Sequence, residues 1–165
     1  MNMKMLRPLT CALLVVGIVA VYLAADAPSN APSIQGSYVL ESRDTPDGKQ
    51  VRPPEVMGMM TFTKDRRNFN VYWTQGGKPA SISLISKYTL SDTEISEEST
   101  YFMMNDGSGP KYETTPSSGK SPVTMKDGKL SFKLPTHDEP AVVFDKDGFT
   151  ATRAGEFVDH WKKID

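Results

Sequence analysis

The sequence is poor in cysteine and histidine, and this scarcity limits the chemistry available to the chain. Its 165 residues include one cysteine, Cys11, and two histidines, His137 and His160. Cys11 lies inside an apolar run near the start, so the rest of the chain can form neither a disulfide nor a thiolate site. Its stability must come from the packing of roughly 130 residues, which is enough for one ordinary hydrophobic core.

The sequence also lacks an excess of charge of either sign. Nineteen Lys and Arg residues are balanced by 20 Asp and Glu residues, which gives a formal net charge of −1. A chain without a global positive field lacks the attraction that draws proteins to polyanions. We therefore expect no nucleic-acid partner.

Residues 1–25 differ in composition from the rest of the chain. Lys4 and Arg7 precede an apolar run over residues 9–25, an arrangement typical of an export signal. Two interpretations stay open, a cleaved signal peptide and an uncleaved membrane anchor, because the run is close to the length that spans a bilayer. Residues 26–35 are rich in Pro, Ser and Ala and predict a flexible spacer. We expect one domain, residues 36–165, in the periplasm or outside the cell, with membrane contact only through a retained anchor.

Short apolar or alternating runs follow one another after residue 36, separated by turn signals such as TPDG, QGGKP and KDGK. This spacing is typical of an antiparallel all-β domain. The last run, 157–164, also fits one apolar helical stripe, and we favour a closing strand. We predict about eight to ten strands, over residues 37–42, 57–63, 68–74, 81–90, 95–104, 122–126, 129–134, 141–144, 149–153 and 157–164.

The alternation of apolar and polar residues is clearest over residues 81–90. Ile82, Leu84 and Tyr88 fall on one face, and Ile85 and Ser86 are the exceptions. A sheet of this many strands avoids exposed edges most simply by closing on itself. We therefore predict a single antiparallel up-and-down β-barrel, whose interior would hold side chains or one small ligand.

The stretch Gly36-Ser37-Tyr38, the PDGK turn and the run PPEVMGMMTFTKDRRNFNVYW resemble the opening third of small bacterial lipocalin-like, calycin-type domains. The likeness extends to the end of the chain in layout, but only residues 36–73 carry recognisable motifs. It implies an up-and-down barrel with a cup for a small, often apolar molecule, and it implies no shared catalytic residue. Lipocalins have Trp in place of Tyr38, beneath a late-strand Arg. The resemblance thus implies that Gly36 and Tyr38 close the barrel with Arg153, or Lys163, as the cation.

We expect the barrel to bind a small hydrophobic or amphipathic molecule without catalysis and without a cofactor or metal. The candidate ligand-binding residues are the apolar ones on the predicted inner faces: Met60, Phe62, Phe69, Val71, Trp73, Ile82, Leu84, Tyr88, Tyr101, Met103, Phe132 and Phe144.

Three other functions stay open. A barrel filled by its own side chains would be structural or would bind a protein through a strand edge or a long loop. An enzyme could use a single Tyr, Arg or Glu in the cup, although the sequence has no nucleophile elbow. Thioethers select Cu(I), but alternation places Met59 and Met60 on opposite faces, as it does Met103 and Met104, so few of the methionines Met57, Met59, Met60, Met103 and Met104 could converge.

The remaining polar segments suggest surface structure. Residues 105–121 show little periodicity and predict a mobile flap near one barrel mouth. They include Gly119-Lys120-Ser121, which ends like a phosphate-binding loop but lacks the helix that should follow. Glu94, Glu97 and Glu98 are expected to face solvent, with Glu97 on the opposite face of its strand from the other two. The two histidines are expected at the surface.

Overall fold

The computed structural model describes residues 33–165, so the predicted leader over residues 1–25, Cys11 and most of the predicted spacer lie outside the described residues. All helix or strand elements assigned within these residues are β-strands. None of the described residues forms a helix long and apolar enough to cross a membrane. The thirteen strands are β1 (Gly36–Asp44), β2 (Gln50–Val51), β3 (Val56–Phe62), β4 (Arg66–Gln75), β5 (Lys78–Leu90), β6 (Glu94–Asn105), β7 (Pro110–Glu113), β8 (Ser117–Pro122), β9 (Thr124–Lys126), β10 (Lys129–Lys133), β11 (Ala141–Phe144), β12 (Gly148–Arg153) and β13 (Phe157–Lys163).

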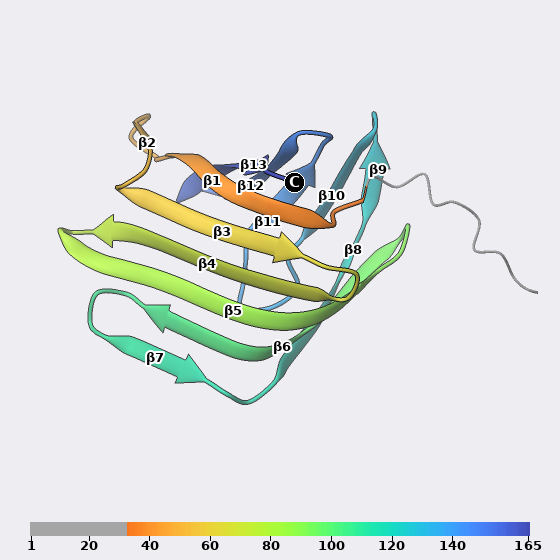
Figure 1. Ribbon diagram of the computed structural model, residues 1–165, viewed down its shortest axis with the longest axis horizontal. Coiled ribbons are helices and arrows are strands. Elements are labelled where there is room, and N and C mark those ends of the chain that lie inside the picture. Colours follow the sequence, from red (N-terminus) through yellow and green to blue (C-terminus); the bar gives the residue numbers. More distant parts are fainter. Residues whose placement is uncertain (1–32) are drawn as a thin grey trace, which may run out of the picture.

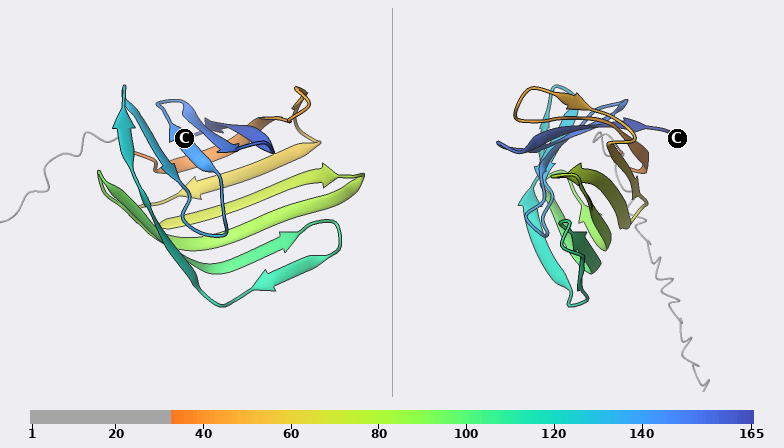
Figure 2. Two further views of the ribbon diagram at one scale, coloured as in Figure 1. Left: turned by 180° about the vertical axis from the view of Figure 1, so that it is seen from behind. Right: turned by 90° about the vertical axis from the view of Figure 1, so that its left-hand side faces the viewer.

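The strands form one antiparallel sheet in which chain neighbours are nearly always sheet neighbours (Figure 1). Strands β3 to β7 follow one another on one side, and β9 to β13 do so on the other. β1 lies between β3 and β13, which places the first and last strands of the domain side by side. The sheet curls through 205° into a half-barrel (Figure 2).

The two edges of this sheet meet at one end only. β8 pairs with the first half of β6 and β9 pairs with β10, and Val123 alone separates β8 from β9. The second half of β6 pairs instead with β7, whose other side has no partner strand within residues 33–165. The prediction of an antiparallel all-β domain is confirmed. The closed barrel is corrected to a half-barrel, because β7 takes the part of the β6 edge that a strand of the opposite half would need.

The segment predicted as a flap, residues 105–121, carries two of the strands that the sequence did not reveal. Pro110–Glu113 forms β7 and Ser117–Pro122 forms β8, both on the edge of β6. All residues of β7 are exposed, so no apolar periodicity marked it. Each predicted run contains strand residues, although residues 122–126 are divided between β8 and β9, and the closing strand is present as β13. Ile85 is 45% exposed and Ser86 is buried, so the two exceptions in β5 follow the regular alternation of the strand.

One end of the half-barrel is filled by aromatic rings. Tyr38 contacts Phe62, Phe144 and Phe149 edge-on, with ring centroids 5.1–6.2 Å apart, and Phe62 contacts Tyr88 at 5.7 Å. Such edge-to-face pairs add to the hydrophobic gain of burying the rings. The Tyr38 hydroxyl donates to the Ile34 carbonyl at 3.0 Å, and burial raises the pKa of Tyr38 to about 12. We call this end the aromatic plug.

A glycine in β8 fixes the spacing between that strand and the chain after β10. A Cβ added at Gly119 would lie 2.3 Å from the backbone oxygen of Pro135, a distance that only a backbone shift could relieve.

Changing Gly119→Ala should lower the free energy of unfolding by about 1–3 kcal/mol, as overpacking does in cores. Urea unfolding measures the loss, and Ser118→Ala at the exposed neighbouring position is the control. Equal stability of the two variants would show that this close approach does not occur.

Candidate functional site

A cleft of about 800 Å³ opens at the end of the half-barrel away from the aromatic plug. One wall consists of inner-face residues of β3 to β6, and the other comes from β12 and β13. The third side is residues 134–140, the connection from β10 to β11, which we call the 134–140 segment. Apolar side chains line most of the cleft, and its charged lining residues are Arg43, Glu55, Glu139, Arg153, Glu156 and Asp159.

The structure divides the twelve predicted ligand-binding residues among three places. Five line the cleft: Met60, Phe69, Val71, Trp73 and Ile82. Five are buried elsewhere in the hydrophobic core and do not line the cleft: Phe62, Leu84, Tyr88, Phe132 and Phe144. The last two, Tyr101 and Met103, are not among the lining residues either.

A β-bulge in β6 explains the position of Tyr101 and Met103. The register with β5 slips between Ser99 and Tyr101, so that Ser86 pairs with Ser99 and Ile85 with Tyr101. An extra residue in a strand reverses which face the following side chains occupy. Beyond the bulge it is Phe102 and Met104 that line the cleft, whereas the ring of Tyr101 contacts exposed Tyr112. A single-strand alternation count could not have detected this shift.

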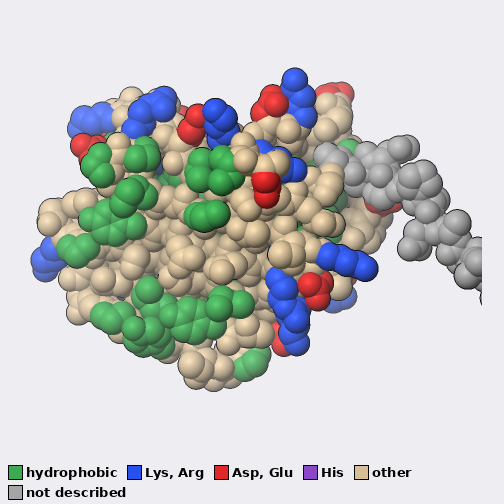
Figure 3. All heavy atoms as spheres, viewed as in Figure 1, with side chains coloured by type: hydrophobic (Ala, Val, Ile, Leu, Met, Phe, Trp, Pro, Cys, Tyr) green, Lys and Arg blue, Asp and Glu red, His purple; other side chains and the backbone are tan. Residues whose placement is uncertain are grey.

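The outer face of the sheet carries several exposed apolar side chains. Met57, Met59 and Tyr72 lie on β3 and β4, and Ile85 and Tyr112 lie on β5 and β7. Figure 3 shows hydrophobic side chains gathered on this face of the molecule. The methionines are therefore split, as alternation predicts: Met57 and Met59 are exposed, while Met60 is buried.

Arg43, on β1, contacts three other residues that line the cleft. Its guanidinium donates to both carboxylate oxygens of Asp159, at 2.5 and 2.8 Å, and lies 4.2 Å from the ring centroid of Phe157 and 5.5 Å from that of Trp73. Burial raises the pKa of Asp159 above its ordinary value, although Arg43 acts in the opposite direction. The bidentate pair and the two rings hold each other in place, because guanidinium planes stack favourably on aromatic faces.

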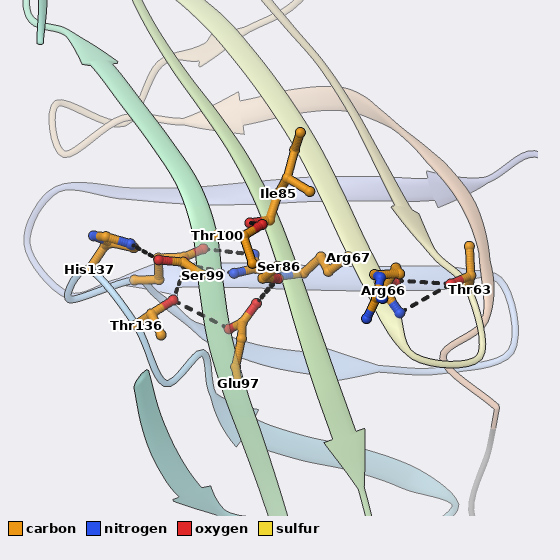
Figure 4. Close-up of polar contacts among 11 residues, drawn as sticks. Thr63, Arg66, Arg67, Ile85, Ser86, Glu97, Ser99, Thr100, Thr136 and His137 are labelled. Carbon is orange, nitrogen blue, oxygen red and sulfur yellow. Dashed lines mark hydrogen bonds and ion pairs between the residues drawn. The ribbon is translucent and has the colours of Figure 1, made fainter. Parts of the chain in front are cut away.

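A buried ion-pair cluster connects β4 and β6 to the 134–140 segment. Arg67 donates from Nε to Glu97 at 2.7 Å and from its two terminal nitrogens to Glu139 at 2.6 and 2.8 Å. Ser86 also donates to Glu97, and Thr136 lies within 3.4 Å of both carboxylates (Figure 4). Burial alone would lower the pKa of Arg67, and the charges of Glu139 and Glu97 outweigh it and raise that pKa. We call these groups the Arg67 cluster.

The position of Glu97 corrects one expectation from the sequence. Glu94 and Glu98 are exposed as predicted, but Glu97 is 4% exposed and lies inside. The alternation placed it on the opposite face of the strand from Glu94 and Glu98, but a buried carboxylate needs a partner, and no local pattern identified Arg67 as that partner. The one signal in the sequence was Ser86, a polar residue at an inward position of the neighbouring strand.

His137 lies in the 134–140 segment and stacks on Phe102, with ring centroids 3.9 Å apart and planes 5° apart. Its Nε2 is 2.8 Å from Ser99 Oγ, and its Nδ1 is 3.6 Å from a carboxylate oxygen of Glu113. Hydroxyl, imidazole and carboxylate thus follow one another as in nucleophilic hydrolases. Ser99 is only 2% exposed and does not line the cleft, so a substrate in the cleft would not reach its hydroxyl.

The residues implied by the lipocalin resemblance for barrel closure are only partly together. A Cβ at Gly36 would lie 2.5 Å from Lys163 Cε, and Lys163 Nζ lies 6.0 Å from the centroid of the Tyr38 ring. Arg153 is elsewhere, where it forms ion pairs with Asp138 and Glu156 at the mouth of the cleft. Of the two cations considered, the structure therefore places Lys163 over Tyr38.

Comparisons with family models, with curated proteins and with solved structures found no match for this chain.

Removing the cation of the Arg67 cluster should be costly, because it leaves two carboxylates buried without a partner. We expect Arg67→Met to lower the free energy of unfolding by about 3–5 kcal/mol at neutral pH. The triple variant Arg67→Met/Glu97→Gln/Glu139→Gln removes all three charges and should recover most of that loss. Urea unfolding of the three proteins compares them. A triple variant as unstable as Arg67→Met would show that lost packing, and not uncompensated charge, causes the effect.

Proposed function

We propose that the cleft binds a small hydrophobic or amphipathic molecule and that it does so without catalysis. The observation that supports this most directly is an apolar cleft of about 800 Å³ beside an otherwise filled core. Its volume lies within the range of roughly 300–1,000 Å³ that small-molecule sites occupy. Inner-face aromatic residues such as Phe69 and Trp73 supply the contact surface.

The distribution of charge favours an amphipathic occupant over a purely apolar one. Val71 is buried and Ile82 is half-buried, whereas the charged residues Arg153 and Glu156 are partly or fully exposed. The buried carboxylates Glu139 and Asp159 of the cleft are each paired with an arginine. Charged groups keep most of their hydration at a mouth and lose it in an interior. A molecule with an apolar body and a polar end would match this arrangement.

The wider setting of this function is also a proposal. The opening motif from Gly36 to Trp73 and the meandering strand order support a lipocalin-like domain, in which the half-barrel would work as the cup. The charged residues before the apolar run over residues 9–25 support export, to the periplasm or beyond the cell, with or without a retained anchor. Binding in that compartment needs no thiol and no cofactor.

A second candidate function, protein interaction, is supported by the outer face. Met57 and Tyr72 are exposed and pair across β3 and β4, and exposed apolar groups of this kind occur where proteins associate. The unpaired side of β7 offers a strand edge as well.

The ligand-binding proposal predicts a specific effect of Trp73→Ala. Titration with N-phenyl-1-naphthylamine, an uncharged fluorescent probe of apolar sites, should show saturable binding to the wild-type protein. The variant should bind about tenfold more weakly, since burial of a large apolar side chain contributes about 1.5–3 kcal/mol. Its loss of unfolding free energy should be smaller than the roughly 3–5 kcal/mol of a fully buried tryptophan, because Trp73 is partly exposed.

Tyr72→Ala is the matched control, because Tyr72 precedes Trp73 on β4 and is exposed on the opposite face. It should leave probe affinity unchanged. Absence of saturable binding to the wild type, or equal weakening by both variants, would contradict a ligand site in the cleft.

A further inference from the structure

Negative charge exceeds positive charge among the residues that line the cleft. Four of its six charged lining residues are carboxylates and two are arginines. Arg67 is not a lining residue but pairs with one of these carboxylates, Glu139. It also pairs with Glu97, so it does not remove the excess. A cleft in which one sign of charge predominates attracts ligands of the opposite sign.

Neither arginine of the lining is free to bind an anionic group. Arg43 forms the bidentate pair with Asp159, and its side chain is only 12% exposed. Arg153 forms ion pairs with Asp138 and Glu156, at 2.8 and 3.3 Å. A carboxylate on a ligand would have to displace one of these partners, and it would also meet the excess of negative charge.

Glu55 differs from the other carboxylates of the cleft. Glu139, Glu156 and Asp159 each have an arginine partner. The side chain of Glu55 makes no hydrogen bond or ion pair with any group within residues 33–165. Because Glu55 is exposed and lines the cleft, its carboxylate lies where the cleft meets solvent, and a ligand can reach it.

The backbone holds Glu55 beside the apolar wall of the cleft. The amide N–H of Glu55 donates to the Arg52 carbonyl at 2.9 Å, in the turn before β3. The next residue, Val56, is completely buried, lines the cleft and pairs with Trp73 on β4. A ligand could therefore place an apolar part against Val56 and Trp73 and a cationic group at Glu55. This pairing would leave no protein group without a partner, since Glu55 would give up only water.

We propose that the molecule bound in the cleft is a cationic amphiphile, with an apolar body and a protonated amine, and that the amine pairs with the carboxylate of Glu55. This inference rests on the proposed function, since it requires that the cleft binds a ligand, and it adds the chemical class of the ligand's polar end. A free carboxylic acid is a poorer match because of its charge. An alcohol is a poorer match because it gains only a neutral hydrogen bond, which is weaker than one between charged groups.

Two ligands of nearly equal shape test the inference. 2-(1-Naphthyl)ethylamine is a cation at neutral pH, whereas 2-(1-naphthyl)ethanol is uncharged, and each can compete with N-phenyl-1-naphthylamine in a titration. The quantity to compare is the ratio of the two affinities in the wild-type protein and in Glu55→Gln, because the difference in hydration of the free ligands then cancels. The wild type should prefer the amine. The ratio should fall about three- to fivefold in the variant, the effect of one ion pair in contact with water.

Glu98→Gln is the matched control. Glu98 is also exposed, but it lies on β6 and does not line the cleft, so the same change of net charge there should leave the ratio unchanged. A salt series gives a second measurement. Raising the ionic strength from about 0.01 M to about 1 M shortens the screening length from roughly 30 Å to roughly 3 Å. The preference for the amine should decrease over this range in the wild-type protein and change little in Glu55→Gln.

The outcomes separate the two proposals. An amine-to-alcohol ratio that is the same in wild type and Glu55→Gln, or that falls equally in Glu98→Gln, would overturn the pairing with Glu55 and leave the ligand site in place. Tighter binding of the anion 3-(1-naphthyl)propionate than of the alcohol would overturn the cationic class and assign the polar end of the ligand to an arginine. Failure of the probe and of all three naphthalenes to bind the wild-type protein would overturn the ligand site itself, and with it this inference.

Discussion

The ion pair of Arg67 with Glu97 and Glu139 is the interaction on which the shape of the cleft depends. A half-barrel has no hydrogen-bonded ladder across its open side, so something else must hold the chain that crosses there. Arg67 lies on β4, Glu97 on β6 and Glu139 in the 134–140 segment, and the guanidinium joins all three. Because the three charges are almost completely buried, they are tolerable only as a fully bonded set, and this requirement fixes where the segment can lie.

The same cluster places the other polar residues of the segment. With Glu139 held by Arg67, Thr136 lies between the two carboxylates and His137 stacks on Phe102 and reaches Ser99. His137 and Asp138 both have positive φ, near 50°, which is uncommon for residues with side chains. The surrounding contacts hold this strained turn, and the cleft gains one side that is rigid and partly polar.

Much of the fold could be predicted from the sequence, and the reasons for the misses are physical. Strands with one buried face, such as β5 and β10, show a period of two, and turn residues mark their ends. β7 is exposed along its length and β8 is rich in Ser and Gly, so neither carries an apolar pattern.

The bulge in β6 leaves no local mark, and it moved Tyr101 and Met103 away from the inner face. Alternation also tells which face a residue occupies but not how far along the half-barrel it lies, so Phe62 in the plug and Met60 in the cleft look alike. The partner of Glu97 is thirty residues away in sequence and could be found only in three dimensions.

The position of β8 and β9 has a mechanical consequence. These strands bond to both edges of the sheet at one end, so that end acts as a hinge. The cleft lies between the two halves of the sheet at the other end. Moving the two halves of the sheet apart at that end would break no backbone hydrogen bond of the sheet and would strain only side-chain contacts. Under the proposed function, the size of a bound molecule would be limited by how far those contacts yield, and the strand register would be the same for a small molecule as for a large one.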